Sequence, residues 1–245
     1  MIPIGRVREL VRYPVKSMAG TPVESASLGW HGIAGDRRLA FRRLGDSSSF
    51  PWLSASRLPE MLCYQPVAVG ESGGEPRFTH VRTPAGDHVE LRGEVLQREI
   101  AERLGSAVEL MELKHGIFDD ASVSVISAAT IAGIGREAGM EIDRRRMRAN
   151  IVLETEDLEP FLEDGWVGGT LVFGEGESMA AVSVTARDLR CVMVNFDPDT
   201  GAQDARVMKA VVRLTGNYAG VYGTVVRTGT IHVGQTVSLA RSPLS

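Results

Sequence analysis

The sequence contains no apolar run of the length that crosses a bilayer, and it has no excess of positive charge. Its 245 residues carry a net charge of −4, whereas a general nucleic-acid binder needs basic side chains to neutralise phosphates. No segment approaches the roughly 20 apolar residues that span a membrane. The first ten residues, MIPIGRVREL, lack the apolar core of a signal peptide. We therefore expect a cytoplasmic protein that acts on a small molecule, with neither nucleic acid nor membrane as partner.

Cysteine and lysine are also scarce. The only cysteines are Cys63 and Cys191, and a reducing compartment keeps such thiols free. Each thiol is then either a packing residue or a reactive group. Two cysteines cannot supply the four thiolates of a common iron–sulfur cluster. The only lysines are Lys16, Lys114 and Lys209, so the position of each lysine is informative.

Short segments rich in Val, Ile and Thr, separated by Gly, Pro and Asp, make up most of the chain. This pattern is typical of strands in a barrel or sandwich, and it predicts an α+β fold that is mostly β. Helical periodicity favours helices at 94–104, at 127–139 with Ser127 as N-cap, and from Asp204 as N-cap to 216. The residues 71–76 read as a hairpin loop. The side chains expected to face inward on the helices are Val95, Leu96, Ile100, Leu104, Ile131, Ile134, Val207, Val211 and Leu214.

Cys191 is the stronger candidate for chemistry of the two thiols. It begins the segment RCVMVNFDPDTG (190–201), which we read as an apolar strand that runs into a turn. Arg187 and Arg190 are close in sequence, and cationic neighbours favour the thiolate that binds metals or attacks electrophiles. The alternative is that Cys191 is a small core residue. Cys63, in the apolar segment MLCYQPV, is assigned to packing.

Three further clusters could hold a phosphate. Lys16 and Ser17 follow a predicted strand, and Arg37 enters another strand together with Arg38 after a glycine-rich turn. A lysine, a hydroxyl and an arginine beside exposed backbone amides make a reasonable phosphate cradle. Arg148 and Asn150 alternate at the start of a further strand, so both could point to one face. Each cluster, taken alone, is also compatible with solvated surface charge.

These clusters, in this order, resemble the MOSC superfamily. The resemblance is to the branch with an N-terminal MOSC-type β domain, which includes the mitochondrial amidoxime-reducing component and bacterial reductases of N-hydroxylated compounds. It implies a MOSC β-barrel, with an N-terminal β domain at 1–95 and the MOSC domain at 96–245. The segments that carry it are YPVKS (13–17), GDR (35–37), the stretch from Asp119 to Thr130, RANI (148–151), EDGWVGG (163–169), RC with DPDTG (190–201) and GTIHVGQTV (229–237).

The resemblance implies a molybdenum–molybdopterin cofactor and assigns residues to it. The cysteine of the RC segment, here Cys191, would be the protein ligand of the metal and the catalytic residue. A soft thiolate suits this metal beside the two sulfurs of the pterin dithiolene. The residues implied to bind the cofactor are Lys16, Ser17, Arg37, Asp120, Ala121, Arg148, Asn150 and Tyr222.

The activity implied is reduction of N-hydroxylated compounds, with electrons from a separate flavin or iron–sulfur donor protein. The alternative is a carrier of persulfide sulfur or of the cofactor, without turnover of its own. Two departures from relatives are visible in the sequence. Ala149 replaces the proline of the RPN segment, and Asp188 occupies a position, three residues before the metal ligand, where relatives often have a second cysteine.

Overall fold

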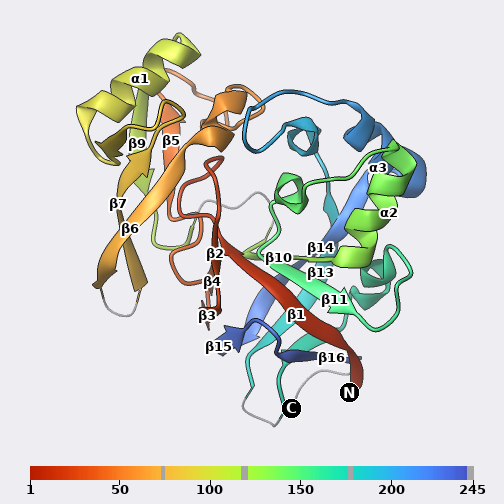
Figure 1. The fold of residues 1–245 in the computed structure, drawn as a ribbon. Helices are drawn as coiled ribbons and strands as arrows, with labels where there is room; N and C mark the ends of the chain where they lie inside the picture. Colours follow the sequence, from red (N-terminus) through yellow and green to blue (C-terminus); the bar gives the residue numbers. More distant parts are fainter. Residues whose placement is uncertain (73–74, 117–120, 176–178, 242–245) are drawn as a thin grey trace.

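A computed structural model describes residues 1–72, 75–116, 121–175 and 179–241 of the chain (Figure 1). The fold is mostly β, as predicted, with a closed barrel as its central element. Among the described residues no α-helix is both long and apolar enough to span a bilayer.

The barrel consists of seven strands that close on themselves. They are β1 (Ile2–Arg12), β10 (Val123–Ser127), β11 (Ile151–Thr155), β12 (Thr170–Phe173), β13 (Ala181–Leu189), β14 (Tyr218–Arg227) and β16 (Thr236–Ala240). Their order is β11-β10-β14-β13-β12-β16-β1, and antiparallel pairing of β1 with β11 completes the ring. Only β10 and β11 run parallel, and helix α2 (Ala128–Ala138) lies in the connection between them.

Closure depends on the first strand, which contacts two barrel neighbours and the short strand β2 (Thr21–Val23). Gly5 sits at the point where β1 passes between β11 and β16, with φ of 151°. A Cβ atom there would lie 2.1 Å from the carbonyl oxygen of Glu154, so only glycine permits this approach. Alternate residues of the strands, such as Val182 and Val184 of β13, point into the barrel and form its apolar core.

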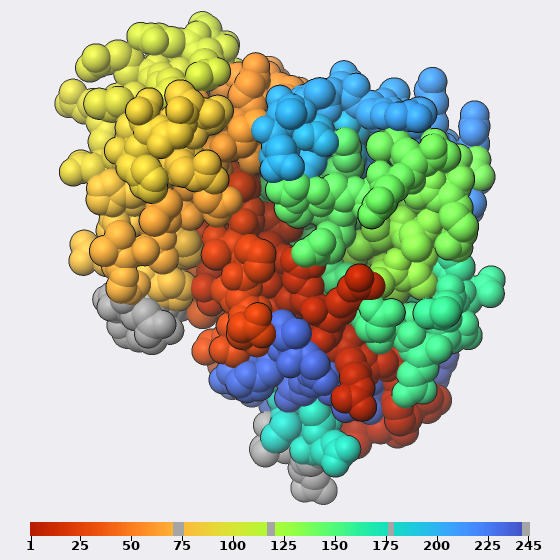
Figure 2. All heavy atoms as spheres, in the orientation of Figure 1, coloured from red at the N-terminus to blue at the C-terminus, as the bar shows by residue number. Residues whose placement is uncertain are grey.

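A second β-rich unit is built mostly from residues before 112. It contains β5 (Leu39–Arg43) paired with β9 (Val108–Glu112), and the hairpin sheet β6 (Gln65–Ser72), β7 (Glu75–Arg82) and β8 (His88–Glu90). Helix α1 (Glu94–Leu104) and the 3₁₀ helix η1 (Pro59–Cys63) cover its core, in which Phe41 and Tyr64 are buried. Figure 2 shows this unit in orange and yellow beside the barrel-side elements in green and blue, with the red first residues between them.

The boundary at 95/96 stays a prediction. β1 comes from the first segment and is a strand of the barrel, while β9 comes from the second and pairs with β5. A smaller sheet of β3 (Ser25–Gly29), β4 (Gly32–Ile33) and β15 (Gly229–His232) also joins the two ends of the chain.

The three α-helices of the described residues lie where the periodicity placed them. α1 has the predicted bounds, and α2 is capped by the Ser127 hydroxyl, which accepts a hydrogen bond from the Thr130 amide. α3 runs from Arg206 to Thr215 and its N-cap is Ala205, so the prediction of Asp204 as N-cap is wrong by one residue. The Asp204 carboxylate still accepts a hydrogen bond from the Arg206 amide. Val95 and Leu214 are exposed rather than inward, because each helix buries only a narrow stripe.

Candidate functional site

A cavity of about 300 Å³ lies where barrel strands β10, β13 and β14 meet the loops that follow β1 and β5. Six residues that the resemblance assigns to the metal or the cofactor line it: Lys16, Ser17, Arg37, Arg148, Cys191 and Tyr222. Its wall also includes Phe50, Ser54, Ser56, Ser124, Arg146, Met147, Asp188, Leu189, Arg190, Met193 and Val194. Residues up to about 200 positions apart are therefore brought to one place.

Cys191 has an exposed side chain at this cavity. It follows β13 and precedes a 3₁₀ turn, η4 (Val192–Asn195), so the prediction that it starts an apolar strand is wrong. The turn forms because Val194 and Asn195 are anchored in the interior. The Asn195 carboxamide accepts a hydrogen bond from the Met208 amide of α3 at 2.9 Å, which ties η4 to that helix. The position of the thiol is thus fixed by buried neighbours.

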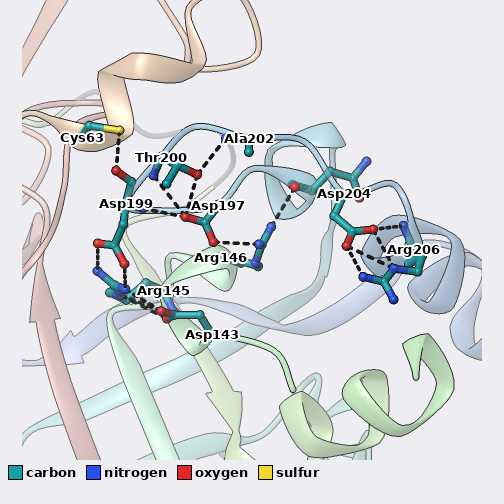
Figure 3. A network of polar contacts seen from close by, with 11 residues as sticks. Cys63, Asp143, Arg145, Arg146, Asp197, Asp199, Thr200, Ala202, Asp204 and Arg206 are labelled. Atoms are coloured by element: carbon teal, nitrogen blue, oxygen red, sulfur yellow. Dashed lines mark hydrogen bonds and ion pairs between the residues drawn. The ribbon is translucent and has the colours of Figure 1, made fainter. Parts of the chain in front are cut away.

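The loop after η4 is fastened to the 3₁₀ helix η2 (Arg144–Met147), as Figure 3 shows. The buried Arg146 donates hydrogen bonds to the Asn195 carbonyl at 2.7 Å and to the Asp197 carboxylate at 3.0 Å. Arg145 bridges Asp143 and Asp199, at 2.6 Å to each carboxylate. Because Arg146 also lines the cavity, this network holds η4, and with it Cys191, against the cavity wall.

Backbone strain is concentrated at the cavity. Five described non-glycine residues have positive φ, and three of them line the cavity: Ser17 at 69°, Arg37 at 46° and Arg148 at 50°. Such conformations are costly and persist where the surrounding structure holds them. The Arg37 amide donates to the Tyr13 carbonyl at 2.6 Å, and Ser17 Oγ accepts from the Ala55 amide at 3.1 Å. Strain of this kind is typical of binding sites.

Two guanidinium groups pack on the ring of Tyr13. The Cζ atoms of Arg37 and Arg148 lie 4.7 Å and 4.4 Å from the ring centroid. Asp36, which is fully buried, accepts hydrogen bonds from Arg37 at 2.5 Å and from the Tyr13 amide at 2.6 Å. Burial alone lowers the pKa of Arg37, but the charge of Asp36 raises it above its ordinary value. Arg37 therefore stays charged, and the two arginines give the cavity a fixed cationic wall.

Asn150 supports this wall from behind and is not among the residues that line the cavity. Its carboxamide oxygen accepts from Arg37 at 3.1 Å and from the Ser124 amide at 3.2 Å, while its Nδ2 donates to the Val11 carbonyl. Arg148 is the αL residue after η2, and β11 begins only at Ile151. The prediction that Arg148 and Asn150 alternate along a strand start is therefore wrong.

The other residues implied for the cofactor are less informative. Asp120 lies outside the described residues. Ala121 is half-buried and is not part of the cavity wall. Lys16 is buried, with its Nζ 5.2 Å from the centroid of the Phe50 ring. Lys16 therefore adds a further cation to the wall.

Arg190 lines the same cavity as the thiol, whereas Arg187 is not among the residues that line it. The guanidinium of Arg187 lies 3.9 Å above the Tyr218 ring. Arg190 donates to the carbonyls of Met147 and Ala219, both at 2.7 Å, and its Nη2 lies 3.0 Å from the Asp188 carboxylate. Proximity in sequence did not predict these partners because β13 ends at Leu189 and the chain turns there.

Sequence reasoning missed several wall residues. Ser54 and Ser56 have their hydroxyls 2.6 Å apart. The S-x-S spacing near Arg57 was the only local signal for them. Ser124 and Asp188 lie in apolar or mixed strand segments and carry no local motif. Asp188 was noted only as a departure from relatives, although it is 1% exposed and faces the cavity.

The donor set of the cavity includes one thiol and no metal cluster. Within the described part of the chain, no group of three or more His, Cys, Asp or Glu side chains could hold a metal ion. A metal at Cys191 would therefore need further ligands from a bound organic group. A single thiol beside five cationic side chains and several hydroxyls fits a metal carried by an anionic, sulfur-containing cofactor.

The family of this chain follows from a match to a protein-family model. The model of the MOSC domain matches residues 112–238, just over half of the chain. The protein belongs to the MOSC domain family. Members of this family bind molybdenum cofactor in general. The matched range holds Arg148, Cys191 and Tyr222, whereas Lys16 and Arg37 precede it.

One solved structure shares the fold over almost the whole chain. YuaD from Bacillus subtilis superposes with a TM-score of 0.54 at 15% identity, over 98% of this chain and 97% of that one. YiiM from Geobacillus stearothermophilus matches 49% of this chain and 54% of its own, with a TM-score of 0.35 at 21% identity. No curated protein matches the MOSC chain described here. At these identities the YuaD likeness supports the fold alone.

Proposed function

We propose that this MOSC protein is a molybdenum-cofactor-binding oxidoreductase that reduces N-hydroxylated compounds with electrons from a separate donor protein. The observation that carries the proposal is the cavity of about 300 Å³, with the exposed thiol of Cys191 in a wall of fixed cations. The volume is at the lower end of the range for small-ligand sites.

The chain offers a distinct group for each part of such a cofactor. Cys191 would ligate the metal, and Lys16, Arg37 and Arg148 would neutralise the pterin phosphate. Ser17, Ser54 and Ser56 add hydroxyl groups that can donate to phosphate or pterin oxygens. When bound, the cofactor supplies a metal that can take an oxygen atom from a substrate.

A separate electron-donor protein is part of the proposal because the chain has few cysteines. Two cysteines in 245 residues cannot ligate a four-cysteine iron–sulfur cluster. A flavin or iron–sulfur protein would therefore deliver the electrons. The chain's own part would be to hold the cofactor, to keep the mouth of the cavity open to a small substrate and to direct protons.

The deciding experiment measures metal and pterin together. Protein from a molybdenum-replete host should contain molybdenum by mass spectrometry and release a fluorescent oxidised pterin. Cys191→Ser should lose most of the metal, and Cys63→Ser, the matched control, should keep it. Wild type without molybdopterin, or Cys191→Ser with full metal and activity, would contradict the proposal.

A sulfur carrier is the second candidate, favoured by the exposure of the Cys191 thiol. In that case Cys191 would carry a persulfide for delivery to another protein. Cyanide would release sulfur as thiocyanate from wild type and from Cys63→Ser, but not from Cys191→Ser. Cyanide-labile sulfur together with an absence of molybdenum would replace the reductase by the carrier.

A further inference from the structure

A buried carboxyl group lies in the wall of the Cys191 cavity and has no part in the cofactor contacts proposed above. Asp188 is the second-last residue of β13, three positions before Cys191, and its exposure is 1%. It nevertheless lines the same cavity as the thiol. A buried carboxyl beside a reaction site has either a structural or a proton-handling role.

Asp188 is contacted from two other strands of the barrel. Ser124 of β10 donates its hydroxyl proton to the Asp188 carboxylate at 3.1 Å, and the Tyr222 side chain of β14 also hydrogen-bonds to it. Ser124 and Tyr222 are direct partners in the β10–β14 ladder. Tyr222 is half-buried and lines the cavity, so it connects the buried carboxyl with the open space.

The charges around Asp188 do not make it a simple ion-pair partner. Arg190 faces it from the chain end of β13, Arg37 from the segment before β5, and both favour the carboxylate. Burial outweighs them and raises the pKa of Asp188 to about 6. Arg190 already donates to two backbone carbonyls, so it does not depend on Asp188 for its position. The other cations that line this cavity are Lys16, Arg146 and Arg148.

We infer that Asp188 and Tyr222 form a proton relay of this cavity, in which Asp188 stores the proton and the Tyr222 hydroxyl passes it to the substrate. The inference rests on the proposed reductase function. Tyr222 would give its hydroxyl proton to the departing substrate oxygen and take the proton of Asp188 in return. Asp188 is thus a proton-storing residue that acts through Tyr222.

The overall reaction balances with one proton from this relay. An N-hydroxylated compound takes up two electrons and two protons, its N–O bond breaks, and the products are the N–H compound and water. The two electrons would be supplied by the flavin or iron–sulfur donor protein of the proposed function. One proton comes from Asp188 by way of Tyr222, the second from solvent, and solvent then reprotonates Asp188.

The first test needs neither cofactor nor turnover. The carboxyl carbon of Asp188, in ¹³C-labelled protein, is followed by NMR across pH, with Asp188→Asn to assign its signal. We expect a midpoint of about 6, and a higher midpoint in Tyr222→Phe, because the hydroxyl that stabilises the carboxylate is lost. A midpoint at the ordinary aspartate value, or no response to Tyr222→Phe, would overturn the relay.

The second test follows a single turnover of reduced, molybdenum-loaded protein with an N-hydroxylated compound. In wild type the rate should fall above pH 6 in proportion to protonated Asp188. Asp188→Asn should be about 100-fold slower at pH 6 and independent of pH, as expected on loss of a general acid. Asp164→Asn is the matched control, because Asp164 pairs with Arg187 and is not in the cavity wall; it should keep the wild-type profile.

The outcomes separate the relay from the reductase. Wild type that turns over, with Asp188→Asn of the same rate and pH profile, overturns the relay and leaves the reductase intact. Wild type that holds molybdenum and reduces no N-hydroxylated compound overturns both. Loss of metal from Asp188→Asn is checked by mass spectrometry, and rates are expressed per bound molybdenum, so a binding defect does not imitate a proton-transfer defect.

Discussion

The two cysteines of the chain have opposite surroundings. Cys63, in η1, is half-buried, and its thiol donates to the Asp199 carbonyl at 3.2 Å. Burial raises the pKa of Cys63, and the nearby Asp199 and Glu60 raise it further. Cys191 is exposed at a cavity with a cationic wall. The two thiols therefore differ in the sign of the neighbouring charges and in their access to a cavity, although the residue type is the same.

Two carboxyl groups repeat this contrast. Asp188, at the Cys191 cavity, is buried, and its pKa is raised to about 6. Asp199, beside Cys63, is bound by Arg145, whose hydrogen bonds lower its pKa. Arg145 is in turn part of the network that holds the loop after η4 (Figure 3). The carboxyl near Cys63 is therefore held in an ion pair with Arg145, whereas the carboxyl near Cys191 is buried in the cavity wall.

The comparison would break if the two thiols reacted alike. At neutral pH iodoacetamide should alkylate Cys191 about 100-fold faster than Cys63, because Cys191 is exposed and the thiolate of Cys63 is disfavoured. Peptide mass spectrometry of cofactor-free protein at successive times measures both rates. Cys63→Ser should leave the rate at Cys191 unchanged.

The two carboxyls should give pH dependences of opposite sign. The pKa of folded Asp188, about 6, exceeds the unfolded value of 3.8. The folded state therefore binds more protons, and this contribution to stability is lost as the pH rises from about 4 to about 6, by up to about 3 kcal/mol. Asp199, with a lowered pKa, loses its contribution as the pH falls below about 4.

Urea unfolding of wild type, Asp188→Asn and Asp199→Asn measures both effects. The titration runs from about pH 3.5 to about pH 7, because the two pKa shifts act in this range. The free energy of unfolding of wild type should exceed that of Asp188→Asn by more at acidic pH than at neutral pH. Wild type should exceed Asp199→Asn by more at neutral pH than at acidic pH. Equal slopes for the two variants would contradict the assigned environments.

The two arginines of the network should contribute unequally. Arg146 is buried and pairs with Asp197, so Arg146→Met should lower the free energy of unfolding by about 2 kcal/mol. Arg145 is half-exposed, and Arg145→Ala should cost less than about 1 kcal/mol. Denaturant titration checks both values. Faster alkylation of Cys63 in Arg145→Ala than in wild type would further indicate that Arg145 orders the loop around Asp199.

Local patterns predicted the elements that depend on local physics. α1 begins at Glu94 because the apolar spacing starts there, and it ends at Gly105 because glycine adopts the αL conformation after Leu104. Patterns failed where distant contacts decide. VMVN has the composition of a strand, yet it forms a 3₁₀ turn because Asn195 is held by α3 and by Arg146.

The candidate site was predicted in part for the same reason. Lys16, Arg37 and Cys191 stand in recognisable segments, so the sequence could propose them, and the structure places all three at one cavity. Ser54 and Ser56 carry only a short serine spacing and Asp188 carries no local motif, since only the fold makes them neighbours of the thiol. Arg190, expected near Cys191, lines the same cavity, and the fold adds Asp188 and two backbone carbonyls as its partners.

The sequence by itself determined the mostly β fold and the helix positions, because propensity and periodicity are properties of neighbouring residues. Tertiary structure alone decided that the barrel closes through β1, that Asn150 supports Arg37 from behind, and that a carboxyl is buried beside the thiol. The reason is physical: burial and charge pairing depend on distances in space between segments that are far apart in the chain.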